Sequence, residues 1–91
     1  MSEPTRVRVV VHGRVQGVFF RDTVRRAALD RNVAGSVSNR RDGAVEAVFE
    51  AEPDAVEALV ALCRRGPPGA RVERVEVSEE PPEGATGFDV S

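Results

Sequence analysis

The chain has 91 residues, 41% of them hydrophobic and 31% charged, with a formal net charge of −2. These values are typical of one globular domain, residues 1–91, and exclude a disordered chain. No apolar run approaches the roughly 20 residues of a membrane-spanning helix. The only cysteine excludes an internal disulfide, and with the only histidine it cannot make a structural zinc site. Since the N-terminus also lacks a secretory signal, we expect a cytoplasmic monomer without a cofactor.

Charge is distributed unevenly along the chain. Residues 1–43 carry nine arginines against four acidic residues, whereas residues 44–91 carry four arginines against eleven acidic residues. A basic half favours an anionic partner, which is either a nucleic acid or a small anion.

Hydrophobic periodicity and turn residues predict the helices and strands. The valines at positions 7, 9 and 11 form the core face of a first strand, and Arg6 and Arg8 lie on its other face. The pair Asp42-Gly43 predicts a hairpin turn. In chain order we expect a strand at 6–12, a helix at 21–31, strands at 34–40 and 44–51, a helix that Pro53 opens and Gly66 closes, a strand from Val72 to Pro81, and a short last strand at 88–90.

This order, β-α-β-β-α-β, is that of the ferredoxin-like α+β fold. In that fold an antiparallel sheet carries two helices on one face, and the first and third strands are central.

The helix patterns also predict the roles of two single residues. Asn32 is expected to end the first helix as a left-handed cap. Cys63 lies on the apolar stripe of the second helix and is expected to be a small core residue, not a nucleophile.

The connection between the first strand and the first helix is the strongest candidate for a binding site. Gly13 and Gly17 can take positive φ, which lets the loop curl so that successive N–H groups point inward. The helix N-terminus adds a positive dipole end, and Arg21 adds a forked cation suited to phosphate. Together these features predict a cradle for a small anion. The alternative is an ordinary glycine-containing turn, because a glycine-rich loop alone is weak evidence.

Asn39 and His12 are the other polar candidates. By strand parity Asn39 shares the core face with Val37, where its amide would project beside Arg21 and hold a water molecule. The alternative for Asn39 is that it begins the hairpin turn, where asparagine is common. Histidine is the residue type that titrates near neutral pH, but nothing in the sequence orients His12, and a structural role is expected.

Residues 13–21 read GRVQGVFFR, and this run resembles the first signature of the acylphosphatase family, G-x-V-Q-G-V-x-F-R, at every fixed position. Gly35, Val37, Asn39, Gly43 and Val45 are similar to its second signature. The departures are Ser36, Ser38 and Ala51, where the family usually has an aromatic residue, a basic or longer residue and a glycine.

The resemblance implies a metal-independent hydrolase that splits acyl phosphates into carboxylate and phosphate. It implies that Arg21 binds the substrate phosphate and that Asn39 orients the attacking water. The remainder of the implied phosphate cradle is the loop backbone at Val15, Gln16, Gly17, Val18, Phe19 and Phe20. The residue types agree with this reaction, because neither a guanidinium nor an amide acts as a base near neutral pH. Such a site offers anion binding and water positioning, and therefore needs a substrate with a good leaving group.

Three other functions were compared with this one. An RNA-binding domain of the same fold needs exposed aromatic residues on its sheet, and the chain has only four phenylalanines and no tyrosine or tryptophan. A P-loop nucleotide site is excluded, since no G-K-[ST] follows the glycines. A non-catalytic domain that binds a small anion is the remaining alternative, and the presence of both Arg21 and Asn39 argues against it.

Overall fold

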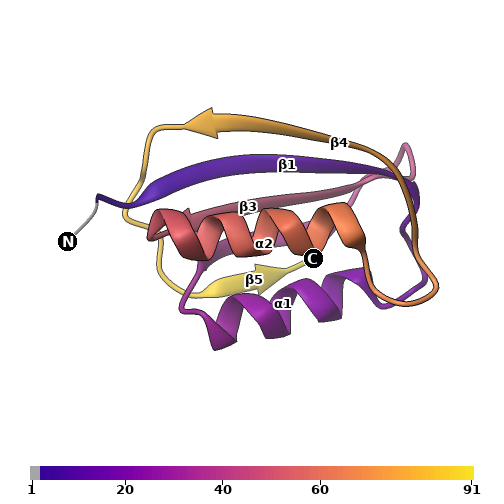
Figure 1. Ribbon diagram of the computed structural model, residues 1–91, viewed down its shortest axis with the longest axis horizontal. Helices are drawn as coiled ribbons and strands as arrows, with labels where there is room; N and C mark the ends of the chain where they lie inside the picture. The colour runs from indigo at the N-terminus through magenta and orange to yellow at the C-terminus, as the bar shows by residue number, and fades with distance from the viewer. Residues whose placement is uncertain (1–2) are drawn as a thin grey trace.

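The computed structural model describes residues 3–91, which form one layer of five strands and one layer of two helices (Figure 1). The strands are β1 (Thr5–Arg14), β2 (Ala34–Asn39), β3 (Val45–Ala51), β4 (Arg71–Glu80) and β5 (Phe88–Val90), and the helices are α1 (Phe20–Asp30) and α2 (Pro53–Arg65).

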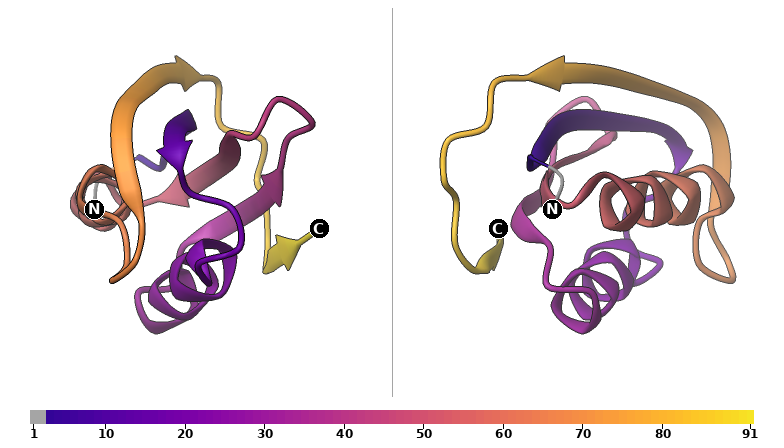
Figure 2. Two further views of the ribbon diagram at one scale, coloured as in Figure 1. Left: turned by 90° about the vertical axis from the view of Figure 1, so that its right-hand side faces the viewer. Right: turned by 60° about the vertical axis from the view of Figure 1, so that its left-hand side comes forward.

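The strand order in the sheet is β4-β1-β3-β2-β5. The first four strands pair antiparallel, and β5 pairs parallel with β2 at one edge. Both helices cover the same face, with α2 against β1, β3 and β4 and α1 chiefly against β2 and β5 (Figures 1 and 2). The predicted ferredoxin-like order and its central strands are confirmed, and the parallel β5 makes the sheet mixed.

The core lies between the sheet and the helices, as the valine pattern predicts. Val7, Val9 and Val11 of β1 are buried there, and the strand places Arg6 on the opposite face. Cys63 is fully buried, and this burial raises the pKa of its thiol to about 12. The thiol is therefore a core side chain rather than a nucleophile.

The expected end of the first strand is wrong by two residues. β1 continues through Gly13 to Arg14, with a bulge where its register against β4 shifts. Gly13 has a φ of 132°, and a Cβ atom there would lie 2.1 Å from the Arg71 carbonyl oxygen. Close packing of β4, and not curling of the loop, therefore requires the glycine at this position.

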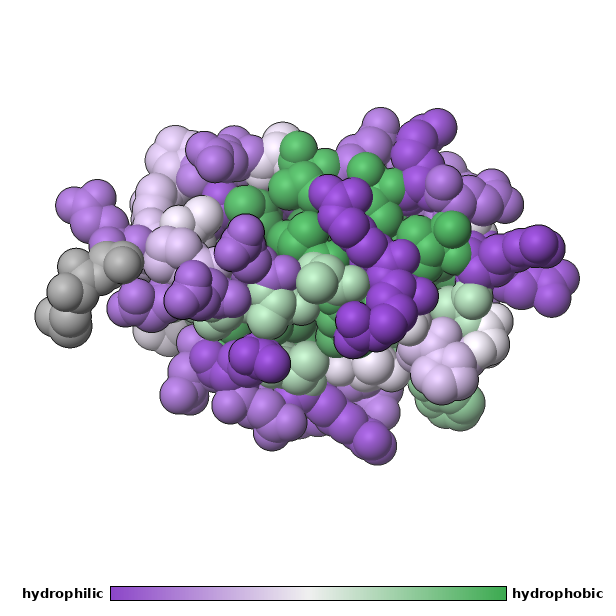
Figure 3. Space-filling model, viewed as in Figure 1, coloured by the Kyte–Doolittle hydropathy of each residue, from purple (hydrophilic) through white to green (hydrophobic). Residues whose placement is uncertain are grey.

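The helix boundaries agree closely with the periodicity. Asn32 follows α1 with a φ of 56°, as expected for a left-handed cap, and Gly66 ends α2. Figure 3 shows apolar side chains gathered between α2 and β4, where Val56, Val60 and Val77 line a groove. Neither helix in residues 3–91 is long and apolar enough to cross a membrane.

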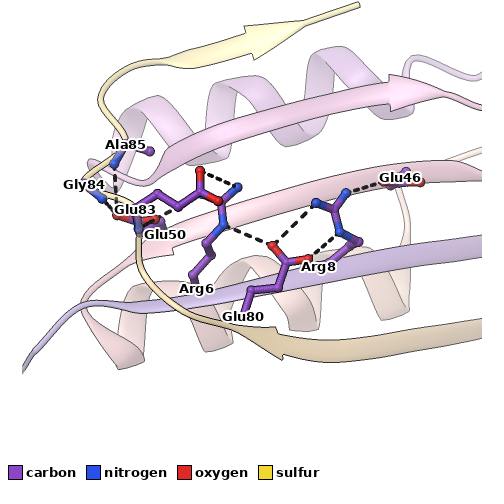
Figure 4. Close-up of polar contacts among 8 residues, drawn as sticks. All are labelled: Arg6, Arg8, Glu46, Glu50, Glu80, Glu83, Gly84 and Ala85. Carbon is purple, nitrogen blue, oxygen red and sulfur yellow. Dashed lines mark hydrogen bonds and ion pairs between the residues drawn. The ribbon is translucent and has the colours of Figure 1, made fainter.

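The sheet face opposite the helices carries a network of arginines and glutamates instead of an apolar layer (Figure 4). Arg8 pairs with Glu46 and Glu80, and Arg6 pairs with Glu80 and Glu50 at 3.1 Å each. These pairs join β1 to both of its neighbours, β3 and β4.

Glu50 has a second role in this network, because it also holds the connection between β4 and β5. Its carboxylate accepts N–H groups from Glu83 at 3.0 Å, Gly84 at 2.8 Å and Ala85 at 3.0 Å. The Glu83 N–H, together with Arg6 and the other two N–H groups, holds the pKa of Glu50 below its usual value of 4.5. The ionised form is therefore the one that folding favours.

The lowered pKa of Glu50 predicts a loss of stability in acid. The ionised carboxylate stabilises the fold above about pH 4.5, and this contribution disappears as the pH falls through the folded-state value. We expect Glu50→Gln to be less stable than the wild type at pH 7, and the difference to shrink toward pH 3. Urea unfolding across this pH range measures it.

Glu79→Gln is the matched control for this prediction. Glu79 is an exposed residue of β4 whose side chain forms no hydrogen bond or ion pair with the rest of residues 3–91. Its variant should follow the wild-type curve. Equal curves for Glu50→Gln and Glu79→Gln would contradict the proposed role of the Glu50 carboxylate.

Candidate active site

The loop between β1 and α1 presents a row of free backbone donors. Gly17 has a φ of 75° and Phe19 a φ of 61°, so the chain turns sharply twice before the helix begins. Within the described chain, none of the N–H groups of residues 15–20 donates a hydrogen bond to another residue. Unpaired N–H groups beside a helix N-terminus favour an anion. The loop thus curls and leaves its N–H groups unpaired, as the glycine pattern predicted, although Phe19 and not Gly13 provides its second turn.

The loop forms one wall of a cleft of about 560 Å³. The cleft also receives side chains from α1, from the end of β2 and from β5. Its lining residues are Val15, Gly17, Phe19, Phe20, Arg21, Asp22, Arg25, Asn39 and Val90. The structure therefore brings Arg21, Asn39 and most of the predicted loop residues together in one place.

Arg21 is the second residue of α1 and is half-buried. Its Nη1 donates a hydrogen bond to the Ser91 carbonyl oxygen at 2.7 Å. Ser91 is itself held by β2, because its N–H donates to the Val37 carbonyl oxygen at 3.0 Å. The Nη1 end of the guanidinium is thereby fixed, and the other N–H donors of the guanidinium stay available to a ligand. The sequence carries no signal for this contact, since it joins a backbone atom to a side chain 70 positions away.

Asn39 is the last residue of β2 and lies on the helix-facing side, in line with Val37. Its side-chain amide has no hydrogen-bond partner among residues 3–91. The hairpin turn is instead stabilised by Asp42, whose Oδ1 accepts the Ala44 N–H at 3.0 Å. The interpretation of Asn39 as a turn-forming side chain is therefore not supported, and its donor and acceptor both remain free at the cleft.

Gln16 and Val18 differ from the other predicted loop residues, because their side chains do not line the cleft. The Gln16 amide donates to the carbonyl oxygens of Arg40 at 2.7 Å and Ala44 at 3.0 Å. These bonds tie the loop to the β2–β3 turn. Val18 packs against the hydrophobic core. The side chains of these two residues therefore hold the loop in place.

His12 lies outside the cleft, in agreement with the expectation that its role is structural. Its Nε2 is 2.9 Å from the Glu76 carboxylate on β4. The hydrogen bond with His12 lowers the pKa of Glu76. Glu76 could not be predicted from the sequence as the partner of His12, because the pairing depends on the register of β4.

Residues 3–91 contain no group of three or more histidine, cysteine or acidic side chains placed to hold a metal ion.

Comparison with known proteins agrees with this geometry. The acylphosphatase family model matches residues 7–90. An acylphosphatase of Rubrobacter xylanophilus is 62% identical over 86 residues, covering 93% of this chain and 78% of the relative. One of Gloeobacter violaceus is 52% identical and covers 99% of this chain and 97% of the relative. Among solved structures, acylphosphatase from Bacillus subtilis is 38% identical, with a TM-score of 0.91 over 96% of this chain and 98% of that one.

The two hydrogen bonds of Gln16 predict that the loop binds phosphate less tightly when this side chain no longer holds its shape. In Gln16→Ala the loop loses its tie to the β2–β3 turn, and inorganic phosphate should bind about three- to tenfold more weakly, the loss of one ordinary hydrogen bond or slightly more. Titration calorimetry with phosphate measures this. Ser38→Ala, on the opposite face of β2, is the control and should bind phosphate normally. Unchanged affinity in Gln16→Ala would show that the loop holds its shape without this side chain.

Proposed function

The chain belongs to the acylphosphatase family and is a hydrolase of that family, and we propose that the cleft around Arg21 and Asn39 is its active site. The observation that carries this proposal is the convergence of three features in one cleft. These are the unpaired N–H groups of residues 15–20, the partly anchored guanidinium of Arg21 and the free amide of Asn39. Each feature alone occurs in many proteins, but together they supply an anion site and a water site side by side.

The phosphoryl group of the substrate is bound in this scheme by the loop N–H groups and by Arg21. Charge spreads over three equatorial oxygens as the phosphoryl group is transferred, so donors that already point at these oxygens lower the barrier. Arg21 contributes a fixed positive charge, because the Ser91 carbonyl oxygen holds one arm of its guanidinium. Little reorganisation is then needed when the substrate binds.

The nucleophile is a water molecule that the Asn39 amide orients. The amide oxygen accepts a hydrogen bond from the water, so that a lone pair on the water oxygen points at phosphorus. A bond forms between water oxygen and phosphorus, and the bond between phosphorus and the acyl oxygen breaks with its electron pair. The products are a carboxylate and inorganic phosphate, and the proton of the water passes to a phosphate oxygen.

The choice of an acyl phosphate follows from the groups that the cleft contains. Arg21, Arg25 and Asn39 donate hydrogen bonds but do not give up a proton. The Asp22 carboxylate pairs with Arg26 at 3.1 Å, and His12 pairs with Glu76 outside the cleft. An alkoxide leaving group normally needs a general acid or a metal. A carboxylate, whose conjugate acid has a pKa of roughly 4 to 5, leaves without either.

We also propose that the chain acts as a cytoplasmic, single-domain monomer that binds no nucleic acid. The fully buried Cys63 thiol supports a reducing location. Against nucleic acid, the outer face of the sheet carries the arginine–glutamate network. Of the four phenylalanines, Phe20 and Phe49 are buried in the core, Phe88 stacks on Phe49, and Phe19 lies in the loop. None offers a stacking surface on that face.

The test of this function compares substrates that share the phosphoryl group and differ in the leaving group. We expect rapid hydrolysis of acetyl phosphate in the presence of EDTA, and alkyl phosphate monoesters of similar size should react orders of magnitude more slowly. The measurement is phosphate release, compared as kcat/KM. Similar values for both sets would reveal a general acid in the cleft, and phosphate binding without turnover would favour the non-catalytic anion-binding domain.

The two proposed roles are separated by one pair of variants. Arg21→Ala should lower activity by roughly 10³ and weaken inhibition by phosphate, because it removes the charge that binds the phosphoryl group. Asn39→Ala should lower kcat by about 10²–10³ while phosphate inhibition stays nearly normal, because only the water loses its partner.

Arg26→Ala is the control for both variants. Arg26 is exposed on the same helix, pairs with Asp22 at 3.1 Å and lies outside the cleft. Equal loss of phosphate binding in Arg21→Ala and Asn39→Ala would place Asn39 in the phosphate cradle. Near-normal turnover in Arg21→Ala would overturn the assignment of the site.

A further inference from the structure

Helix α1 begins without the side-chain cap that commonly satisfies the first N–H groups of a helix. Phe19 occupies the N-cap position, and no side chain forms a cap hydrogen bond there. Serine, threonine, aspartate or asparagine at this position would place an oxygen on the N–H of the second or third helical residue. Such an oxygen would compete with a bound anion. Within residues 3–91 the N–H groups of Phe20, Arg21 and Asp22 therefore remain unpaired.

Thr23 stabilises this uncapped helix start from its carbonyl side. The Phe19 carbonyl oxygen accepts the Thr23 N–H at 3.0 Å, as the N-cap carbonyl of a helix ordinarily does. The same oxygen accepts the Thr23 hydroxyl at 2.9 Å. The hydroxyl thus gives the N-cap carbonyl a second donor and leaves the unpaired N–H groups free.

The second bond is important because the backbone of Phe19 is strained. Its φ of 61° and ψ of 25° are those of the left-handed region, which a bulky side chain rarely adopts. Strained backbone persists only where the surrounding structure holds it. Thr23 holds it by binding the carbonyl end of the peptide unit that joins Phe19 to Phe20.

The orientation of that peptide unit determines the direction of the Phe20 N–H. The unit is planar and trans, so the Phe19 carbonyl oxygen and the Phe20 N–H point in opposite directions. Because the oxygen points along α1 toward Thr23, the N–H points out of the helix start. Phe20 lines the cleft, whereas Thr23 is half-buried outside it.

We propose that Thr23 is a positioning residue whose hydroxyl holds the Phe19–Phe20 peptide unit so that the Phe20 N–H faces the phosphoryl group. This inference rests on the proposed function of the cleft, since the phosphoryl group on Arg21 is the ligand of that N–H. Thr23 contributes by preorganising a donor. Its loss should therefore weaken phosphate binding and slow hydrolysis together.

The test compares Thr23→Val with Thr23→Ser, because valine keeps the shape of threonine and serine keeps its hydroxyl. In Thr23→Val inorganic phosphate should bind about two- to tenfold more weakly, the effect of one hydrogen bond. The kcat/KM for acetyl phosphate should fall by a similar factor. Thr23→Ser should restore most of both values. Titration calorimetry and phosphate release are the measurements.

Thr5→Val makes the same chemical change at the end of β1 that is remote from the loop. The Thr5 side chain forms no hydrogen bond with the rest of residues 3–91, so this control should behave as the wild type. The midpoint of thermal unfolding should change little in Thr23→Val, because the Phe19 carbonyl keeps its bond to the Thr23 N–H. An affinity loss that Thr23→Ser does not restore, or that Thr5→Val shares, would overturn the proposal.

NMR of the ¹⁵N-labelled protein observes the Phe20 N–H directly. Saturation with inorganic phosphate should shift the Phe20 amide resonance in the wild type and in Thr23→Ser, and shift it clearly less in Thr23→Val. A hydroxyl that only stabilised the helix would leave this shift unchanged at saturation.

The outcomes separate this inference from the function on which it rests. Normal hydrolysis of acetyl phosphate, with the same phosphate affinity and Phe20 shift in the wild type and Thr23→Val, overturns the role of Thr23 alone. A protein that binds phosphate but cleaves no acyl phosphate overturns the proposed function, and the Phe20 shift then still decides the role of Thr23 in anion binding. A wild-type Phe20 resonance that does not respond to phosphate overturns the inference.

Discussion

The carboxylate of Glu50 is the contact on which the geometry of the cleft most depends. It binds three consecutive N–H groups at residues 83–85 and so directs the connection that leads from β4 to β5. Along that path the chain reaches the far edge of the sheet, where β5 pairs with β2 (Figure 1). The pairing brings Val90 and Ser91 to the cleft, where the Ser91 carbonyl oxygen anchors Arg21. A buried charge on the outer face thus helps to position the Arg21 guanidinium at the cleft on the other face.

Much of this architecture could be predicted from the sequence, because it depends on local periodicity. The alternating valines of β1 and the Pro53 and Gly66 boundaries of α2 correctly predicted their elements. The bulge at Gly13 could not be predicted, since it arises from the approach of Arg71 on another strand. The same holds for the contacts of Glu50 and Ser91, which depend on strand register and on the path of a connection without regular structure.

The sequence predicted most of the residues that meet at the cleft, but not which loop residues line it and which support the loop from outside. The residues of the loop signature share one short segment, yet they divide into two groups in space. Gln16 and Val18 turn away from the cleft to hold the hairpin turn and the core, whereas Phe19 and Arg21 face the cleft. A sequence pattern cannot distinguish a residue that touches a ligand from one that supports the loop, because both must lie in the same few positions.

Backbone donors of the loop and side chains of the cleft contribute differently to substrate specificity. Loop N–H groups and a guanidinium recognise any phosphoryl group, so they supply rate without discriminating between acyl groups. Discrimination requires contacts beyond the phosphate, and the apolar surface available there belongs to Phe19 and Val90. Neither side chain can donate or accept a hydrogen bond, so any contact that it makes is apolar and separate from the polar groups of Arg21 and Asn39.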